Sequence, residues 1–170
     1  VRKRDVLSAL RTAIEASWEL LDEVERSVLA QSSIFAGPFS VEDAEAVLEA
    51  PDVVDVLASL VDRSLLRSSG DGHFSLYVSI RELAAERLPS SSRAALAARH
   101  RAWVLESTRP LWEEFARTGA SKARKALAAA KDELLVVGDD PLAILYLEPT
   151  LAVESGYDDL IATLEKGISL

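Results

Sequence analysis

The stretch "LVDRSLLRSSGDGHFSLYVSIRELAAERL", residues 60–88, decides the fold. It begins as the end of an apolar helix, crosses a Gly-Asp-Gly turn at 70–72 and becomes helical again. Two short runs beside the turn, SLLR and HFSL, are strand candidates, and the glycines tolerate the positive φ that a tight loop needs. Helix, hairpin and helix within so few residues are typical of a winged helix.

Four helices are expected upstream of this stretch. Asp22 with Glu25, and Ser40 with Asp43, have the spacing of capping boxes, which open the second and third helices. Pro51 suits the first turn of the fourth helix. The apolar face of the first helix comprises Leu7, Leu10, Ile14, Trp18 and Leu21. The apolar face of the fourth comprises Val53, Val56, Leu57, Leu60 and Val61.

A Pro-Ser-rich stretch at 89–93 is the expected domain boundary, so we predict a winged-helix domain over 1–90 and a helical segment over 91–170. Asp140 caps a helix that Gly156 ends, and a last helix follows it in an αα-hairpin. Two earlier stripes also predict helices. The first, interrupted at Pro110, comprises Leu96, His100, Trp103, Val104, Ser107 and Leu111. The second comprises Ala123, Leu127, Ala130, Leu134 and Val137.

Charge and composition restrict the classes of function. The chain has a net charge of −9, and residues 1–88 hold nine Lys and Arg against 16 Asp and Glu. A nucleic-acid binder usually has a basic patch, so the acidity of the winged part weighs against DNA. The chain lacks cysteines, which fits a cytoplasmic protein. No apolar run approaches the ~20 residues that span a bilayer, so no membrane association is expected.

Motifs that carry chemistry are absent from the sequence. It has no P-loop, no HExxH and no GxSxG. His73 is expected to be a solvated turn residue and His100 a packed helix residue. The adjacent pairs 139–140 and 158–159 are expected to be caps and solvated acids, because neighbours on a helix do not face each other. We therefore expect no catalysis, no catalytic residue and no metal site in this chain.

The helix before the wing is a poor candidate for reading DNA. A recognition helix lies in the major groove and offers Arg, Lys, Asn or Gln to base edges. Here residues 51–63 carry Asp52, Asp55 and Asp62 against Arg63 alone. Direct binding of nucleic acid is therefore not expected, although a DNA-binding winged-helix regulator remains the alternative function.

Four segments together resemble one protein family. The resemblance is to the winged-helix segment that follows the nucleotide-binding core in STAND-type signal-transduction ATPases, which include AfsR/LuxR-type bacterial transcriptional regulators and relatives of the NB-ARC proteins. Residues 93–170 resemble the TPR-like helical region that follows in that family, here as an incomplete repeat array. The segments are SWELLDEVERSVL (17–29), SIFAGPFSVEDAEAV (33–47), LVDRSLL (60–66) and SIRELAAERL (79–88).

The resemblance implies a switch in signal transduction. The family's winged helix folds back on the ADP-bound core, ATP exchange releases it, and the helical repeats sense protein partners. ATP or ADP would then be a cofactor of the parent protein, bound upstream of this chain, with none in the chain itself. A Met-His-Asp motif that touches nucleotide in NB-ARC proteins aligns with Leu76, Tyr77 and Val78. This chain departs from the motif, which weighs against nucleotide sensing at these positions. Tyr77 is the candidate for a nucleotide contact, because its hydroxyl can donate one hydrogen bond to a phosphate, and packing in the wing is the favoured interpretation.

We therefore expect a mainly α fold with a small β-hairpin, and a regulatory function. The chain would dock on the upstream nucleotide-binding domain and bind protein partners through its helical segment. A plain helical scaffold whose wing has no partner is a further alternative. Residues expected to be important for the structure are Trp18, Phe35, Gly37, Phe39, Leu60, Leu65 and Ile80.

Overall fold

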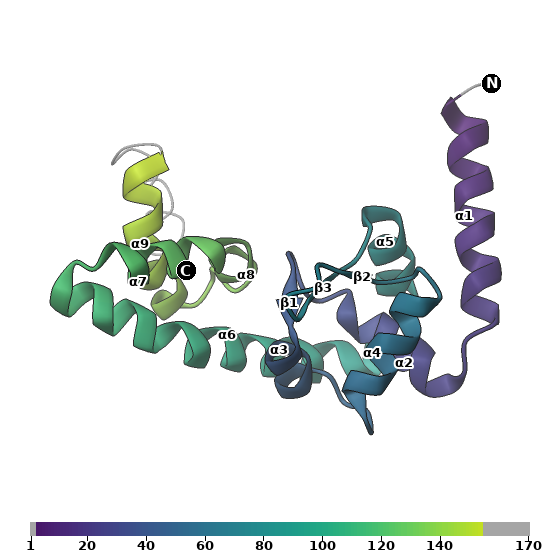
Figure 1. Cartoon of the computed structure of the whole chain (residues 1–170), viewed down its shortest axis with the longest axis horizontal. Coiled ribbons are helices and arrows are strands. Elements are labelled where there is room, and N and C mark those ends of the chain that lie inside the picture. Colours follow the sequence, from purple (N-terminus) through teal and green to yellow (C-terminus); the bar gives the residue numbers. More distant parts are fainter. Residues whose placement is uncertain (1–2, 155–170) are drawn as a thin grey trace. The chain divides into compact units, whose positions relative to one another are not determined.

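The computed structural model describes residues 3–154 (Figure 1). This part of the chain is mainly helical and has a small three-stranded antiparallel sheet, so the expected mainly α fold with a β-hairpin is confirmed. The chain divides into two compact units, Val1–His100 and Arg101–Leu170. The Pro-Ser-rich stretch at 89–93 is the turn before a long helix and the first turn of that helix. The helix expected after Gly156 lies outside the described residues.

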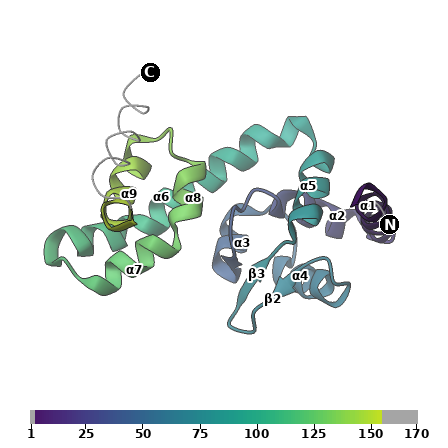
Figure 2. The same cartoon turned by 90° about the horizontal axis from the view of Figure 1, so that it is seen from above.

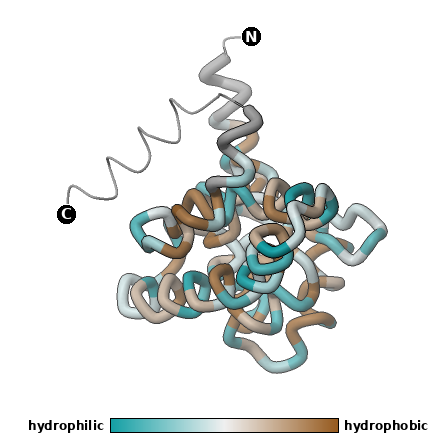
Figure 3. The backbone as a smooth tube through the Cα atoms, turned by 90° about the vertical axis from the view of Figure 1, so that its left-hand side faces the viewer, coloured by the Kyte–Doolittle hydropathy of each residue, from teal (hydrophilic) through white to brown (hydrophobic). Residues whose placement is uncertain are grey.

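The first unit contains most of the elements. Its elements are α1 (Lys3–Glu19), α2 (Glu23–Ser32), β1 (Phe39–Ser40), α3 (Val41–Val47), α4 (Val53–Asp62), β2 (Arg67–Ser68), β3 (His73–Ser75), α5 (Val78–Arg87) and the start of α6 (Ser90–Thr118). Along the described chain, hydrophobic and hydrophilic stretches are interspersed (Figure 3).

Both predicted capping boxes are confirmed. The side chain of Asp22 accepts a hydrogen bond from the N–H of Glu25, and the Glu25 carboxylate accepts one from the N–H of Asp22. Ser40 and Asp43 make the same reciprocal pair at the start of α3. Each box satisfies two amide donors that a helix start leaves without partners.

The start of α4 differs from the prediction. Pro51 was expected in the first helical turn, but the helix begins at Val53 and Asp52 precedes it in the left-handed region, with φ 47°. The residue before the helix therefore turns the chain sharply, and Pro51 belongs to that turn. On the predicted apolar face, Val53, Leu57 and Leu60 are buried.

The sheet has the strand order β1-β3-β2, with both pairs antiparallel. The predicted hairpin is β2–β3, and Gly70 and Gly72 in its loop have φ of 79° and 84°, as a tight turn requires. Figure 2 shows the hairpin projecting beyond the neighbouring helices. Strand β1, which pairs Phe39 with Phe74, was not predicted because two residues are too few for an alternating pattern.

Aromatic rings form the centre of the first unit. Phe35 and Phe39 stack with ring centroids 4.2 Å apart, and Phe74 approaches Phe39 at 5.9 Å. His100 contacts the edge of Phe35 and is 1% exposed, so its expected packed position is confirmed. All of the hydrophobic side chains expected to be important are buried: Trp18, Phe35, Phe39, Leu60, Leu65 and Ile80.

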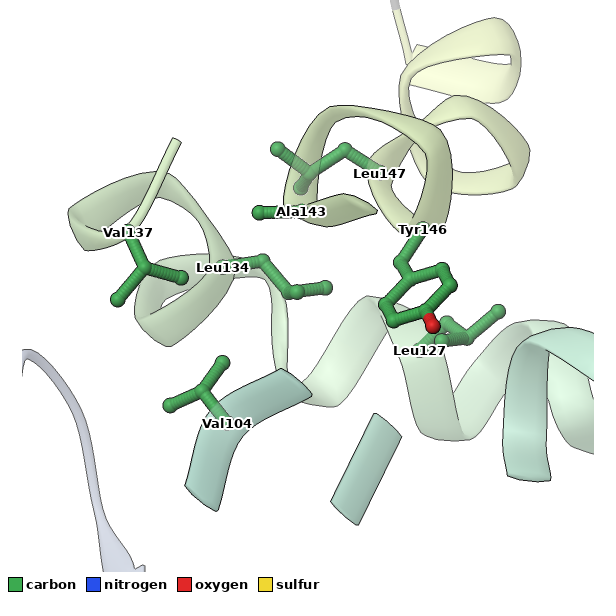
Figure 4. Packing of buried hydrophobic residues seen from close by; sticks show 7 residues of the cluster. All are labelled: Val104, Leu127, Leu134, Val137, Ala143, Tyr146 and Leu147. Carbon is green, nitrogen blue, oxygen red and sulfur yellow. The ribbon is translucent and has the colours of Figure 1, made fainter. Parts of the chain in front are cut away.

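The second unit contains the rest of α6, then α7 (Ser121–Ala129), α8 (Lys131–Val136) and α9 (Pro141–Glu154). Asp140 caps α9 as predicted, because its carboxylate accepts from the N–H of Leu142 at 2.9 Å. Side chains from all these helices meet in one core (Figure 4). The core comprises Val104, Leu127, Leu134, Val137, Ala143, Tyr146 and Leu147.

Two helix boundaries in the second unit differ from expectation. Pro110 was expected to interrupt a helix, but α6 continues through it to Thr118. The stripe from Ala123 to Val137 suggested one helix, whereas the structure breaks it into α7 and α8 at Ala130, with φ −85° and ψ 1°. The apolar spacing correctly predicted which side chains are buried, because both short helices face the core with residues of this stripe. The buried residues are Ala123, Leu127, Leu134 and Val137. Among residues 3–154, no helix is long and apolar enough to cross a bilayer.

Candidate functional site

Tyr77, the candidate for a nucleotide contact, lies between β3 and α5. Its backbone is extended (φ −66°, ψ 146°), and its carbonyl accepts the amides of Ile80 and Arg81 at 3.0 and 2.9 Å. The side chain makes no capping bond and is 50% exposed. The Arg67 guanidinium lies over the ring, 5.3 Å from its centroid. The ring therefore lies half exposed at the surface and makes a cation–π contact with Arg67.

The two residues beside Tyr77 have opposite environments. Leu76 is 6% exposed and belongs to the core, whereas Val78 is 71% exposed at the first position of α5. Of the three positions that the family resemblance aligned with a nucleotide-contacting motif, only Tyr77 and Val78 thus present their side chains to solvent. Together they form a small apolar surface at the start of α5.

A groove of about 370 Å³ lies next to this surface. Side chains from α1, from the end of α4 and from the start of α5 line it. Leu10 was expected on the apolar face of the first helix, but it is 45% exposed and lines the groove, whereas Ile14 and Trp18 of the same face are buried. The principal lining residues are Leu10, Ile14, Arg63, Leu65, Tyr77 and Ile80.

Two ion pairs join the helices that surround the groove. Arg11 of α1 donates to both carboxylate oxygens of Glu86 of α5, at 3.2 and 2.6 Å, which lowers the pKa of Glu86. Arg63 donates through Nε to Glu25 at 3.1 Å. Glu25 is almost fully buried, and the hydroxyl of Ser59 is the main cause of its lowered pKa. The groove is consequently built from helices joined by charge-assisted bonds.

The exposed side of α4 is mainly acidic. Asp52, Asp55 and Asp62 are all exposed there. In the β2–β3 hairpin, which also exposes Arg67, the Nδ1 of His73 lies 3.2 Å from Asp71, and both residues are exposed, which confirms the solvated position expected for His73. The hydroxyl of Ser69 also donates to Asp71 and lowers the pKa of that carboxyl.

The predicted acidic pair at 139–140 has separate roles. Asp139 accepts a 2.7 Å hydrogen bond from Arg101, and Asp140 caps α9. Asp158 and Asp159 lie outside the described residues. Within residues 3–154, no cluster of three or more His, Cys, Asp and Glu side chains is arranged to hold a metal ion.

Comparison of the chain with protein-family profiles, with curated proteins and with solved structures gives no significant match.

Sequence reasoning missed two residues of this site. Arg67 is one of them, because its stacking on Tyr77 depends on the strand register, in which Arg67 lies opposite Ser75. The exposure of Leu10 could not be recognised from the sequence, because Leu10 belongs to a regular apolar stripe. For Arg67, an available signal was the aromatic residue two positions beyond its partner in the hairpin, because diagonal neighbours across strands are within reach of long side chains.

Proposed function

We propose that the chain is a non-catalytic regulatory part of a STAND-type signal-transduction ATPase, in which a winged helix docks on a nucleotide-binding domain of the same polypeptide. The element order supports a winged helix. A helix (α2), a strand (β1), two helices (α3 and α4) and a hairpin (β2–β3) follow one another, and β3 lies in the middle of the sheet.

The observation that carries the proposal is the contrast between two surfaces of the first unit. The exposed side of α4, where a DNA reader needs cations, presents Asp52, Asp55 and Asp62. The start of α5 presents Tyr77 and Val78 beside an apolar groove. Phosphates would be repelled by the first surface, whereas a protein surface could bury the second. Docking on a protein domain therefore agrees better with the charges than reading DNA does.

The helical unit supports the second half of the proposal, binding of protein partners by a TPR-like segment. Helices α7 and α8 both pack on α9, and several large apolar side chains of α8 and α9 stay exposed among the described residues. Such a surface favours protein contact. These side chains are Leu135, Val136, Leu142 and Leu145.

Association with the nucleotide-binding domain of the parent protein tests the docking. We expect the chain to bind that domain more tightly with ADP than with ATP, and Val78→Asp to abolish binding because it buries a charge. The matched control is Val54→Asp, since Val54 is also an exposed valine but lies on α4. A parent protein without a P-loop upstream of this chain contradicts the proposal, as does binding that Val78→Asp leaves intact.

The role of Tyr77 is tested separately. Tyr77→Phe keeps the ring under Arg67 and removes only the hydroxyl, so a loss of ADP preference with unchanged docking would assign the hydroxyl to the nucleotide. An unchanged preference would leave Tyr77 as a packing residue.

The DNA-binding alternative predicts different behaviour. A DNA reader would bind duplex DNA with an affinity that falls steeply as salt rises. We expect no such binding from 50 to 200 mM salt. Salt-dependent binding that Arg67→Ala weakens would replace the docking proposal with the alternative.

A further inference from the structure

A second pocket of the first unit combines an apolar wall with three guanidinium groups. It has a volume of about 320 Å³, at the lower end for sites that bind small molecules. Leu88, Pro89 and Leu96 contribute apolar lining, and Trp18 adds an aromatic ring. The cations that line it come from α2, α5 and α6: Arg26, Arg87 and Arg99.

Two of the arginines are fixed by backbone carbonyls. Arg26 donates to the carbonyls of Trp18 and Glu19, at 3.2 and 2.8 Å. Arg99 donates through Nε to the carbonyl of Val47 at 2.9 Å. These bonds use only some of the five N–H donors of each guanidinium, and they hold the charge in place before any ligand arrives.

Arg87 is held in a different way. Its guanidinium lies 5.9 Å from the centroid of the Trp18 ring. Among the described residues, its guanidinium makes no hydrogen bond and no ion pair, although its charge also acts on the neighbouring Glu86. The donors of a stacked guanidinium lie in its plane and stay available for a carboxylate, which Arg binds in bidentate geometry.

The carboxylates around the pocket are exposed. Glu23 and Glu49 line it, and Glu19 lies 3.7 Å from Arg26 with its side chain 66% exposed. Glu49 pairs with Arg99 at 2.7 Å, but its side chain is 72% exposed, so an incoming anion can displace it at little cost. Arg26 and Arg99 are thus paired with exposed carboxylates, whereas no ion pair of Arg87 is present among the described residues.

We infer that this pocket binds a small organic anion, a carboxylate carried on an apolar or aromatic body. The carboxylate accepts from Arg87 and from the remaining donors of Arg26 and Arg99, and the body packs on Leu88 and Leu96. The site is separate from the groove at Tyr77, and it does not depend on the docking proposed above.

The test uses phenylacetate as the probe and phenylacetamide as its neutral counterpart. Titration of the ¹⁵N-labelled chain, with the Trp18 indole signal assigned through Trp18→Phe, should give saturable shifts at Trp18 and Ser92. We expect a dissociation constant of about 1 mM for a ligand of this size. Phenylacetamide should give shifts that do not saturate.

Two variants are expected to change the affinity in opposite directions. Arg87→Gln should weaken binding by about threefold or more, and Glu49→Gln should strengthen it by about twofold, because it frees Arg99. Glu45→Gln changes the net charge equally outside the pocket and should have no effect. If Arg87→Gln fails to fold, Arg87→Lys, which keeps the charge and loses the planar fork, should weaken binding in the same direction.

Three results would overturn the inference. The first is the absence of saturable shifts at the pocket up to 50-fold above the expected constant, which is about 50 mM. The second is an equal response to phenylacetamide. The third is binding that is unchanged in Arg87→Gln.

Discussion

The Oε1 atom of Glu25 accepts a 2.6 Å hydrogen bond from the hydroxyl of Ser59, which joins the first turn of α2 to α4. The same oxygen accepts from Arg63, and Oε2 accepts from the amide of Asp22. A single carboxylate thus completes a helix cap and links two helices. A buried carboxylate with this many donors is more stable charged than neutral.

This linkage predicts an acid-sensitive fold. Because the folded pKa of Glu25 lies below its ordinary value of 4.5, its contribution to stability is complete above pH 4.5 and is lost as pH falls through the folded pKa. Glu25→Gln should lower the free energy of unfolding at pH 7 by about 2 kcal/mol, because an amide N–H₂ would meet a donor. Urea unfolding from pH 3 to 7 measures both effects.

The matched control for this experiment is Glu23→Gln. Glu23 lies in the same helical turn but is exposed, so its substitution should change stability by less than about 0.5 kcal/mol. If the stability of Glu25→Gln and of the wild type falls equally between pH 7 and pH 3, a group other than Glu25 causes the loss of stability in acid.

Phe39→Ala should destabilise the first unit. Phe39 is 1% exposed, stacks on Phe35 and lies beside Phe74 in the sheet. Removing the ring leaves a cavity that costs about 3–5 kcal/mol. Thermal unfolding followed by circular dichroism measures the loss. Phe74→Ala is the comparison, because Phe74 is only partly buried and should cost less; unchanged unfolding of Phe39→Ala would remove the claim.

Ser64→Gly should stabilise the chain. Ser64 follows α4 with φ 61°, and the amides of Ser64 and Leu65 donate to the carbonyls of Val61 and Leu60, the two bonds of a Schellman motif. Glycine adopts this left-handed backbone without strain, so the free energy of unfolding should rise by about 0.5–1 kcal/mol. Ala58→Gly, in the interior of α4, should lower it by about 1 kcal/mol. A loss of stability in Ser64→Gly would contradict this account.

The sequence allowed prediction of those features that depend on local chemistry. The two capping boxes, the cap at Asp140 and the glycine loop of the hairpin are each specified by a few adjacent residues. The end of α4 gave no such signal, because Ser64 occupies the position where glycine usually marks a left-handed residue. Strand β1 is formed by tertiary pairing with β3, which no pattern of two residues can indicate.

The candidate sites were less predictable than the fold. Tyr77 came from a family resemblance, but its exposure and its contact with Arg67 depend on how the hairpin meets α5. The anion pocket draws Arg26, Arg87 and Arg99 from three helices. Nothing in their spacing relates them, because each is an ordinary surface arginine in its own helix. Sites assembled from distant elements require the tertiary structure.

Pro110→Ala should stabilise the second unit. Proline inside α6 lacks the N–H that would donate to the carbonyl of Glu106, and its ring crowds that carbonyl, at a cost of about 3 kcal/mol in a regular helix. Some of this gain is lost because alanine makes the unfolded chain more flexible, so the expected increase is about 1–2 kcal/mol. The midpoint of thermal unfolding should rise accordingly. Pro89→Ala, in the turn before α6, removes no such conflict and should give no increase. If Pro110→Ala lowers the midpoint instead, the core around Val104 and Leu127 requires a bend that proline supplies.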